Sequence, residues 1–472
     1  MSTSSEAVLG LEPAASSGTG IAPQIQAGDR SSGRWIEDWR PEDPQFWAEM
    51  GEEVAKRNLI FSILSEHIGF CVWSLWSVFV LFLGPEYGLD PGQKFLLTTM
   101  PAAAGAALRI PYTLAVAKFG GRNWTVVSAL LLLIPTAFTA LVLEPGVSFS
   151  TLLVAAALAG FGGGNFSSSM ANIDSFYPMH RKGWALGLNA GGGNIGVAAT
   201  QLVGLALLAT VGREHPRMML VVYMPLVIVS ALCAGRYMDN LRVATNEPRA
   251  LRNVAKLRHT WLIALLYIGS FGSFIGFSFA FGQVLQVQFA DTFDTPVKAA
   301  YLTFLGPLLG SLARPIGGKL ADRRSGATVT LYTFMAMTAG ATVVVTASVA
   351  ESLGLFLVGF VVLFVLTGIG NGSIYKMIPS IFNTEAQLAI DAGADDVTAR
   401  KQARTRSRSL IGFTGATGTF GGVMVNLTLR QSFLSSGTGT AAYIGFIGLY
   451  LLCAAVTWAV YVRPISRLER TS

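Results

Sequence analysis

The chain has 472 residues, of which 52% are hydrophobic and 13% are charged, and its mean hydropathy is +0.52. Soluble domains carry about 25% charged residues, so this chain lacks the polar side chains that would cover a soluble globule of its size. The composition excludes a soluble fold and indicates an all-α integral membrane protein, because a membrane barrel would show short segments of alternating polarity. The net charge of +7 comes from basic residues dispersed between apolar segments, which argues against a nucleic-acid partner.

Residues 1–57 form a polar N-terminal segment before the first apolar run. The part up to Gly33 is rich in Ser, Gly and Ala, so we expect it to be partly disordered. No cleavable signal peptide is visible, since no apolar core follows a basic N-terminus. Residues 34–47 are rich in Trp, Pro and Asp, and this composition predicts a segment that docks on a cytoplasmic partner.

From Asn58 onward the chain contains twelve apolar runs, each long enough for the roughly 20 helical residues that cross a bilayer. The predicted membrane helices cover 58–82, 94–117, 124–143, 150–176, 184–211, 217–239, 259–290, 297–321, 327–349, 353–383, 407–433 and 440–462. Only three cysteines occur, far apart and inside these runs, so neither a disulfide framework nor a metal site is predicted. Glycine runs lie within helices rather than between a strand and a helix, so no cofactor and no enzymatic activity are expected.

Basic residues are concentrated in every second linker between these helices. By the positive-inside rule those linkers are cytoplasmic, so both termini are predicted to be cytoplasmic as well. The basic linker 240–258 divides the chain into two six-helix halves, 58–239 and 259–462. An insertion loop at 384–406 and a tail at 463–472 are predicted on the same side of the membrane.

The two halves repeat a pattern around an arginine inside the membrane. Helix 2 has Gly105 four residues before Arg109, and helix 8 has Gly310 four residues before Arg314. Glycine-rich stretches also recur in helices 4 and 10 and in helices 5 and 11. Such duplication predicts two pseudo-symmetric halves with a substrate site at the interface between them.

Arg109 and Arg314 lie too deep in their helices to be end anchors. A guanidinium in hydrocarbon is costly and keeps its charge, so each is expected to face the interior and bind an anion. Planar guanidinium groups suit planar oxyanions such as nitrate, nitrite or a carboxylate. The competing interpretation is a structural ion pair with Glu66 of helix 1 or Asp174 of helix 4.

Helix 5 carries Gly192 and Gly193 within a run of three glycines, and helix 11 carries Gly418 within a second glycine-rich stretch. Helices without side chains at such positions let their backbones approach a very small substrate, and the neighbouring Asn194 offers an amide donor. Close packing between helices explains such glycines as well, and both interpretations stay open here.

Four stretches resemble the nitrate/nitrite porter family, often called NarK-type, of the major facilitator superfamily. Stretches 187–197 and 412–422 are similar to the paired nitrate signatures of that family, and stretches 271–278 and 370–379 are similar to other parts of it. The likeness extends from about Trp35 to helix 12. It implies the major facilitator fold, with twelve transmembrane helices, and the transport of nitrate and nitrite across the cell membrane.

The resemblance also implies roles for single residues. In that family one arginine of helix 2 and one of helix 8 clamp the anion, and Arg109 and Arg314 match those positions. The family's helix 5 asparagine matches Asn194, and Tyr267 is identified as the site aromatic of helix 7.

The resemblance implies alternating access, either as nitrate/proton symport or as nitrate/nitrite exchange. Proton coupling requires a group that changes its protonation, and the candidates are Lys376, Glu66, His67 and Asp174. Lys376 stands out because a lysine inside the membrane changes protonation when it is desolvated, which arginine does not. Two rival functions are a transporter of another small organic anion and a transporter-like receptor that binds an anion and signals.

Overall fold

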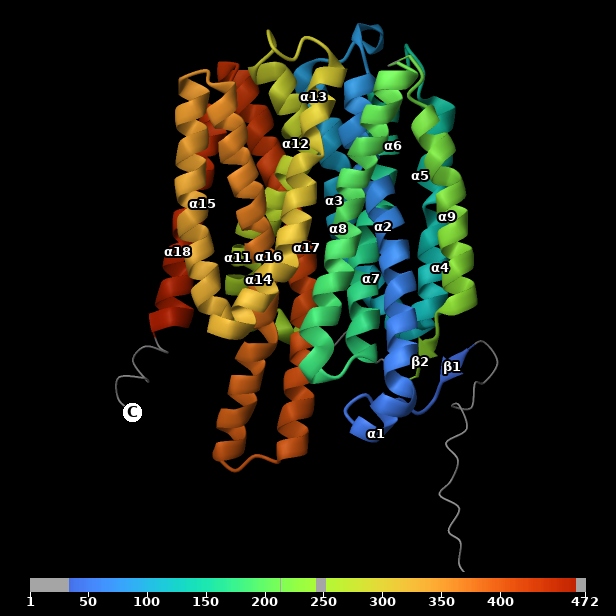
Figure 1. Ribbon diagram of the computed structural model, residues 1–472, viewed down its shortest axis with the longest axis vertical. Coiled ribbons are helices and arrows are strands. Elements are labelled where there is room, and N and C mark those ends of the chain that lie inside the picture. The colour runs from blue at the N-terminus through green and yellow to red at the C-terminus, as the bar shows by residue number, and fades with distance from the viewer. Residues whose placement is uncertain (1–33, 213, 243–251, 464–472) are drawn as a thin grey trace, which may run out of the picture.

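The computed structural model describes residues 34–212, 214–242 and 252–463. Long helices form one bundle, in which the first half of the chain lies beside the second half (Figure 1). In chain order the elements are β1 (Trp35–Ile36), α1 (Pro44–Phe46), η1 (Trp47–Gly51), α2 (Glu52–Phe82), η2 (Pro85–Tyr87), α3 (Pro91–Phe119), α4 (Gly121–Leu131), α5 (Leu133–Val142), α6 (Phe149–Leu158), α7 (Gly160–Phe176), α8 (Met179–Thr210), α9 (Met218–Tyr237) and β2 (Asn240–Leu241). They continue with α11 (Arg258–Tyr267), η3 (Ile268–Gly272), α12 (Ser273–Gln288), α13 (Pro296–Thr303), α14 (Leu305–Arg324), α15 (Gly326–Val349), α16 (Leu353–Asp391), α17 (Asp396–Ser436), α18 (Thr440–Thr457) and η4 (Trp458–Val462).

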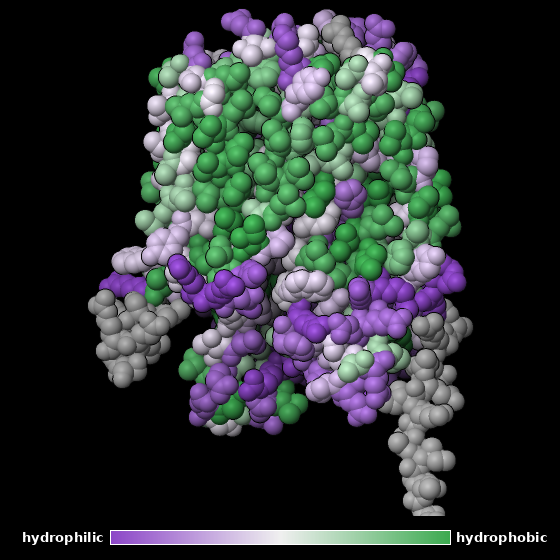
Figure 2. Space-filling view, in the orientation of Figure 1, coloured by the Kyte–Doolittle hydropathy of each residue, from purple (hydrophilic) through white to green (hydrophobic). Residues whose placement is uncertain are grey.

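Ten helices among the described residues are long and apolar enough to cross a membrane. Many of their large apolar side chains are exposed on the outside of the bundle. Figure 2 shows these side chains as an apolar belt between two polar ends. Such a belt fits the hydrocarbon layer of a bilayer and not water. The prediction of an all-helical membrane protein is confirmed.

The predicted helices at 94–117 and 297–321 form as α3 and as α13 followed by α14, but neither is among the ten apolar helices. The reason is their composition: α3 contains Arg109 and two internal prolines, and α14 contains Arg314 and a charged last turn. Both helices nevertheless pack inside the bundle, α3 against α7 and α17 and α14 against α16. They position the two arginines of the predicted site.

The stretch predicted as an insertion loop at 384–406 is mostly helical. α16 continues to Asp391 and α17 begins at Asp396, so the two helices project beyond the bundle as a hairpin (Figure 1). Asp395 caps α17, because its side chain accepts a hydrogen bond from Thr398 N at 2.9 Å. We call this end of the molecule the hairpin end.

The segment 34–47 docks on the hairpin end of its own bundle. β1 pairs in parallel with β2, and the buried Trp39 lies edge-on to Phe176 with 5.3 Å between ring centroids. The first membrane helix runs on from this segment, since the helical stretch begins at Pro44 instead of near Asn58. The segment thus docks on its own chain, and the cytoplasmic partner expected for it stays a prediction.

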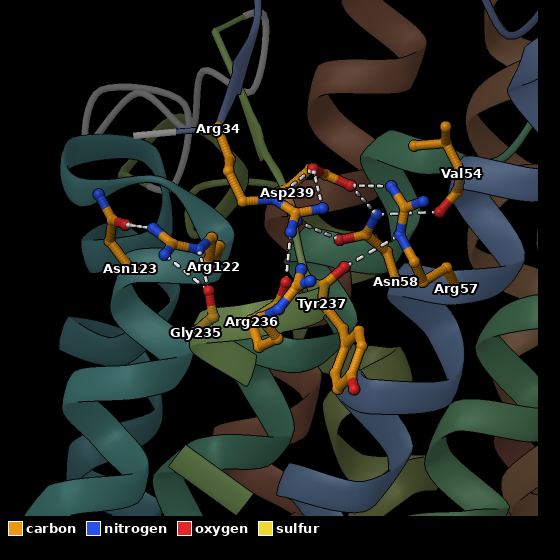
Figure 3. A network of polar contacts seen from close by, with 10 residues as sticks. All are labelled: Arg34, Val54, Arg57, Asn58, Arg122, Asn123, Gly235, Arg236, Tyr237 and Asp239. Atoms are coloured by element: carbon orange, nitrogen blue, oxygen red, sulfur yellow. Dashed lines mark hydrogen bonds and ion pairs between the residues drawn. The ribbon is translucent and has the colours of Figure 1, made fainter. Parts of the chain in front are cut away.

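A buried carboxylate, Asp239, fixes this segment to the bundle (Figure 3). Its oxygens accept hydrogen bonds from Arg57 at 2.5 Å, from Arg34 at 3.0 Å and from Asn58 at 3.1 Å. Burial alone raises the pKa of Asp239, but hydrogen bonds from Arg57 and Asn58 and the charges of Arg57 and Arg34 outweigh it and hold this pKa below its usual range. Asp239 therefore stays ionised at neutral pH and joins the N-terminal segment, α2 and the end of α9.

Candidate functional site

Arg109 and Arg314 lie close to the same pair of aromatic rings. Arg109 comes from α3 and is 0% exposed, and Arg314 comes from α14 and is 2% exposed. The Cζ atom of Arg109 lies 4.3 Å from the ring centroid of Phe166 and 5.2 Å from that of Phe271. The Cζ atom of Arg314 lies 5.6 Å and 5.9 Å from the same two centroids. Helices far apart in the chain thus bring both guanidinium groups to one aromatic pair.

The hydrogen bonds of the two guanidinium groups go to neutral acceptors. Arg109 donates from Nε to Gly163 O at 3.1 Å and from Nη1 to Gly415 O at 2.7 Å. Arg314 donates from Nη2 to the Tyr267 hydroxyl at 3.1 Å. Nη2 of Arg109 and Nη1 of Arg314 are buried and donate to no acceptor in the described parts of the chain. Unused donors of this kind are costly in a buried site and suit it to an anion that supplies acceptors.

The structure does not contain the ion pair of the competing interpretation. Among the residues that the structure describes, no Asp or Glu oxygen lies within 4.0 Å of either guanidinium. Asp174 pairs instead with Lys182 at 3.2 Å and with Arg408. Glu66 accepts hydrogen bonds from a hydroxyl and an amide. The site therefore holds two positive charges that no carboxylate of the described residues pairs with.

Tyr267 and Gly418 form one side of the site. The Tyr267 ring stacks on that of Phe271, with centroids 5.0 Å apart. Gly418 of α17 packs against Tyr267 so closely that a Cβ at this position would overlap the ring. The glycine leaves room for the ring, whose hydroxyl accepts the hydrogen bond from Arg314.

Two aromatic residues of the site were not predicted. Phe166 of α7 lies next to both arginines, and Tyr375 of α16 has its ring centroid 5.2 Å from the Cζ atom of Arg314. The Tyr375 hydroxyl is buried and has no hydrogen-bond partner within the described chain. Both residues belong to stretches that the internal repeat and the family resemblance had marked. Nothing in the sequence separates them from aromatic residues that face lipid or the core.

The predicted site glycines of α8 contact α2 and not the arginines. A Cβ at Gly192 would overlap Ile63, and a Cβ at Gly193 would overlap the Glu66 carboxylate. In this structure both glycines serve the close packing of α8 on α2, which is the alternative stated above. Asn194, the next residue, is buried, and its Oδ1 accepts no hydrogen bond from any described residue.

The four coupling candidates have very different surroundings. Glu66 is fully buried, and His67 lies with Nδ1 3.1 Å from Gly192 O. Asp174 is held by two basic residues. The expected desolvation of Lys376 is wrong, because its side chain is 40% exposed and pairs with an aspartate in a wide cavity. Its helix, α16, carries it toward the hairpin end, where water reaches it.

A cavity of about 890 Å³ lies between α7, α8, α14, α16 and α17 and reaches Arg314. Its lining includes Asn383 of α16 and Arg404 of α17, next to the hairpin, and exposed residues such as Trp184 and Lys319, so its mouth lies at the hairpin end. Its charged lining residues are Lys182, Arg314, Lys319, Lys376, Arg404, Arg408, Asp174 and Asp322. This excess of basic residues creates a positive potential that draws anions toward Arg314.

Residues 67–393 match the sequence model of the Major Facilitator Superfamily. The match covers more than half of the chain, so the chain belongs to this superfamily. Its members are transporters and not enzymes, and the expectation that this chain is no enzyme is confirmed on that ground.

Within the superfamily, the chain is similar to proteins named for nitrate and nitrite. The nitrate/nitrite transporter NarU of Salmonella typhimurium is 36% identical over 450 residues, which cover 91% of this chain and 96% of the relative. The probable nitrate/nitrite antiporter NarK2 of Thermus thermophilus is 32% identical over 458 residues, which cover 92% of this chain and 98% of the relative. The chain is thus a member of the nitrate/nitrite porter family and a multi-pass protein of the cytoplasmic membrane.

Two solved structures share the fold. The xylose transporter XylE from E. coli, in a partially occluded inward open conformation, has a TM-score of 0.63 at 12% identity, with 87% of this chain and 98% of that chain covered. The nucleoside transporter NupG has a TM-score of 0.60 at 12% identity, with 86% and 100% covered. At this identity the likeness shows the fold alone, which is the expected major facilitator fold.

Proposed function

We propose that this protein carries nitrate and nitrite across the membrane by alternating access, with the anion held between Arg109 and Arg314. One observation carries the proposal: each of the two buried guanidinium groups keeps a nitrogen without an acceptor, and no carboxylate pairs with either in the described chain. The names of the relatives support nitrate and nitrite as the anions.

The shape of the site favours a small planar oxyanion. Nitrate offers three coplanar acceptors to the nitrogens that Arg109 and Arg314 leave unused. The rings of Phe166 and Phe271 lie beside both guanidinium groups and offer flat faces to a flat anion. Tyr267 holds the orientation of the Arg314 fork.

The remaining predicted site residues act around this clamp. Gly418 keeps space for the Tyr267 ring, and Gly192 and Gly193 let α8 approach α2. That close approach sets the position of Asn194, whose buried amide is the proposed additional donor to the anion.

We further infer twelve membrane crossings, in two six-helix halves at 58–239 and 259–462. α3 and the pair α13–α14 run through the bundle alongside the ten apolar helices, which supports counting them as crossings (Figure 1). The basic linkers lie at the hairpin end, so this end and both termini are assigned to the cytoplasm. The linker 240–258, the 384–406 hairpin and the tail 463–472 belong to that side.

Alternating access requires that contacts at the end opposite the hairpin open and close. Phe95 of α3 stacks on Phe433 of α17 with centroids 5.6 Å apart. Arg430 Nε donates to Gly92 O at 3.1 Å, joining the same two helices. These contacts support a cavity that faces the cytoplasm, and they must break when the site faces outward. Either proton symport of nitrate or nitrate/nitrite exchange follows this cycle.

The test is uptake of nitrate into proteoliposomes, with nitrite, formate or acetate as competitors. Arg314→Lys keeps the positive charge and removes the fork, and Arg323→Lys on the same helix is the matched control because Arg323 is exposed. We expect nitrate and nitrite to compete, the Arg314 variant to lose uptake and the control to keep it. Stronger competition by formate or acetate would indicate a carboxylate transporter, and nitrate binding without flux would indicate a receptor.

A further inference from the structure

Glu66 is a buried carboxyl group with an incomplete set of partners. It lies in the middle of α2 and is 0% exposed. Its Oε2 accepts hydrogen bonds from Ser169 Oγ of α7 and from Asn189 Nδ2 of α8, the latter at 2.7 Å. Its Oε1 is buried and has no hydrogen-bond partner among the described residues. Oε2 therefore accepts two hydrogen bonds, while Oε1 accepts none from the described residues.

The space around Glu66 fits a carboxyl group. Gly193 of α8 faces Oε1 so closely that a Cβ there would overlap the oxygen. Asn189 Nδ2 also donates to Ser169 Oγ, so the hydroxyl that donates to Glu66 is itself held in place. A carboxylate held only by neutral groups is costly when buried, and a neutral carboxylic acid with its proton on Oε1 costs less.

The charges that reach Glu66 come from the anion site. Arg109 of α3 and Arg314 of α14 act electrostatically on the carboxyl group, without an ion pair. On α7, Asp174 is already paired with two basic residues, and His67 on α2 lies against a carbonyl of α8. Of the other helices packed on α2, α12 has no charged residue. The charged or titratable residues of α8, α9, α4 and α13 lie near the ends of those helices: His180, Arg181, Lys182, Arg236, Arg122 and Lys298. Arg109 and Arg314 are thus basic groups whose charge reaches Glu66 from the anion site, and this contribution changes when an anion neutralises them.

We propose that Glu66 is the proton-binding site of this transporter and that its protonation is linked to anion binding at Arg109 and Arg314. The proposal rests on the proposed function, because it needs an anion at the arginines. With the clamp empty, the two positive charges offset part of the cost of burying the Glu66 carboxylate. A bound nitrate offsets one of these charges, so the carboxylate loses stabilisation and takes a proton from the cavity water. When nitrate leaves, the same proton returns to water.

The route for this proton is short. Met170 lines the cavity, and its sulfur accepts from Asn189 Nδ2 at 3.7 Å, so the Ser169–Asn189–Glu66 group lies directly behind the cavity wall. Linkage is reciprocal: if nitrate favours proton binding, low pH must favour nitrate binding by the same factor. The protein is thereby a nitrate/proton symporter, with one proton carried for each anion.

The experiment measures nitrate affinity and proton uptake of the purified full-length protein. In weakly buffered detergent solution with a pH-sensitive dye, nitrate should cause proton uptake, and affinity should rise about tenfold from alkaline to acid pH. Glu66→Gln imitates the protonated form, so we expect acid-like affinity at every pH and no proton uptake. Glu86→Gln, at the exposed turn after α2, is the matched control and should behave like the unchanged protein.

Ser169→Ala provides a second test of the role of Glu66 if the Glu66 variant does not fold. The Ser169 hydroxyl donates to the carboxylate, so its loss should move the midpoint of the pH dependence to higher pH while leaving the dependence itself. Proton uptake that survives in Glu66→Gln, or an unmoved midpoint in Ser169→Ala, would overturn the proposal. Loss of proton uptake in His67→Gln with retention in Glu66→Gln would assign the proton to His67. A protein that binds no nitrate at any pH would instead overturn the proposed function.

Discussion

Two regions of this protein bury charge in opposite ways. The carboxylate of Asp239 is surrounded by Arg34, Arg57 and Asn58, so both of its oxygens have charged or amide donors. Arg109 and Arg314 are buried as deeply, but they meet carbonyl oxygens, a hydroxyl and aromatic rings. A balanced buried charge fixes a fold, whereas an unbalanced one is costly and is retained where it binds something.

The comparison separates two kinds of mutational effect. Changes at the Asp239 network should lower the free energy of unfolding and leave anion affinity unchanged. Changes at the arginine pair should lower anion affinity and leave the fold intact.

Arg109→Lys and Arg314→Lys should each weaken nitrate binding by about a hundredfold, or roughly 2.7 kcal/mol. Lysine keeps the positive charge but offers no planar fork, so two directed hydrogen bonds to the anion are lost. Nitrate titration by calorimetry measures the affinity, and size-exclusion chromatography with thermal unfolding checks the fold. Near-normal affinity would defeat the fork argument. Loss of folded protein would restore a structural role for the arginines.

Asp239→Asn should lower the free energy of unfolding by about 2 kcal/mol at neutral pH, since two arginines lose a buried partner. The pKa of Asp239 is lower in the folded state than in the unfolded chain. Its contribution is therefore complete above the unfolded-state pKa and is lost as pH falls through the folded-state pKa. The variant and the unchanged protein should converge in acid. Denaturant unfolding across pH measures this, and a difference that persists in acid would contradict it.

Gly418→Ala should weaken nitrate binding by about tenfold, or roughly 1.4 kcal/mol. The added methyl group overlaps the Tyr267 ring, which must shift and release its hydrogen bond from Arg314. Gly445→Ala is the matched control, because a Cβ there meets nothing within 4 Å. Equal nitrate affinities for the two variants would show that Tyr267 does not orient the Arg314 guanidinium.

Hydropathy predicts most of this fold because a helix that crosses the lipid needs a long run of apolar residues, which is visible in the sequence. It fails where a helix leaves the lipid. The first helix begins at Pro44 instead of near Asn58, and the 384–406 insertion is mostly helical, yet both stretches are polar. Helix propensity and capping, as at Asp395, continue the helices there, and a hydropathy pattern carries no record of either.

The sequence predicts those site residues whose burial in the membrane carries a high free-energy cost. A membrane arginine is expensive, so Arg109 and Arg314 stand out, and the repeat relates them. Phe166 and Tyr375 do not stand out, because aromatic residues are common throughout membrane helices. The pairing of Asp174 with Arg408, 234 residues away, depends on how α7 meets α17 and has no local pattern.

The smallest expected effect is that of Lys376→Gln, which also tests the location of the coupling group. Lys376 pairs with Asp322, but both side chains are well exposed, and such a pair contributes less than about 1 kcal/mol. Its charge helps to attract anions into the cavity, so the initial rate of uptake should fall modestly and the effect should shrink with added salt. Dependence on an imposed pH gradient should remain, because the proposed proton-binding group is the buried Glu66 and not Lys376. If gradient-driven uptake disappeared in Lys376→Gln and persisted in Glu66→Gln, the proton-coupling group would be Lys376 in the cavity and not the buried Glu66.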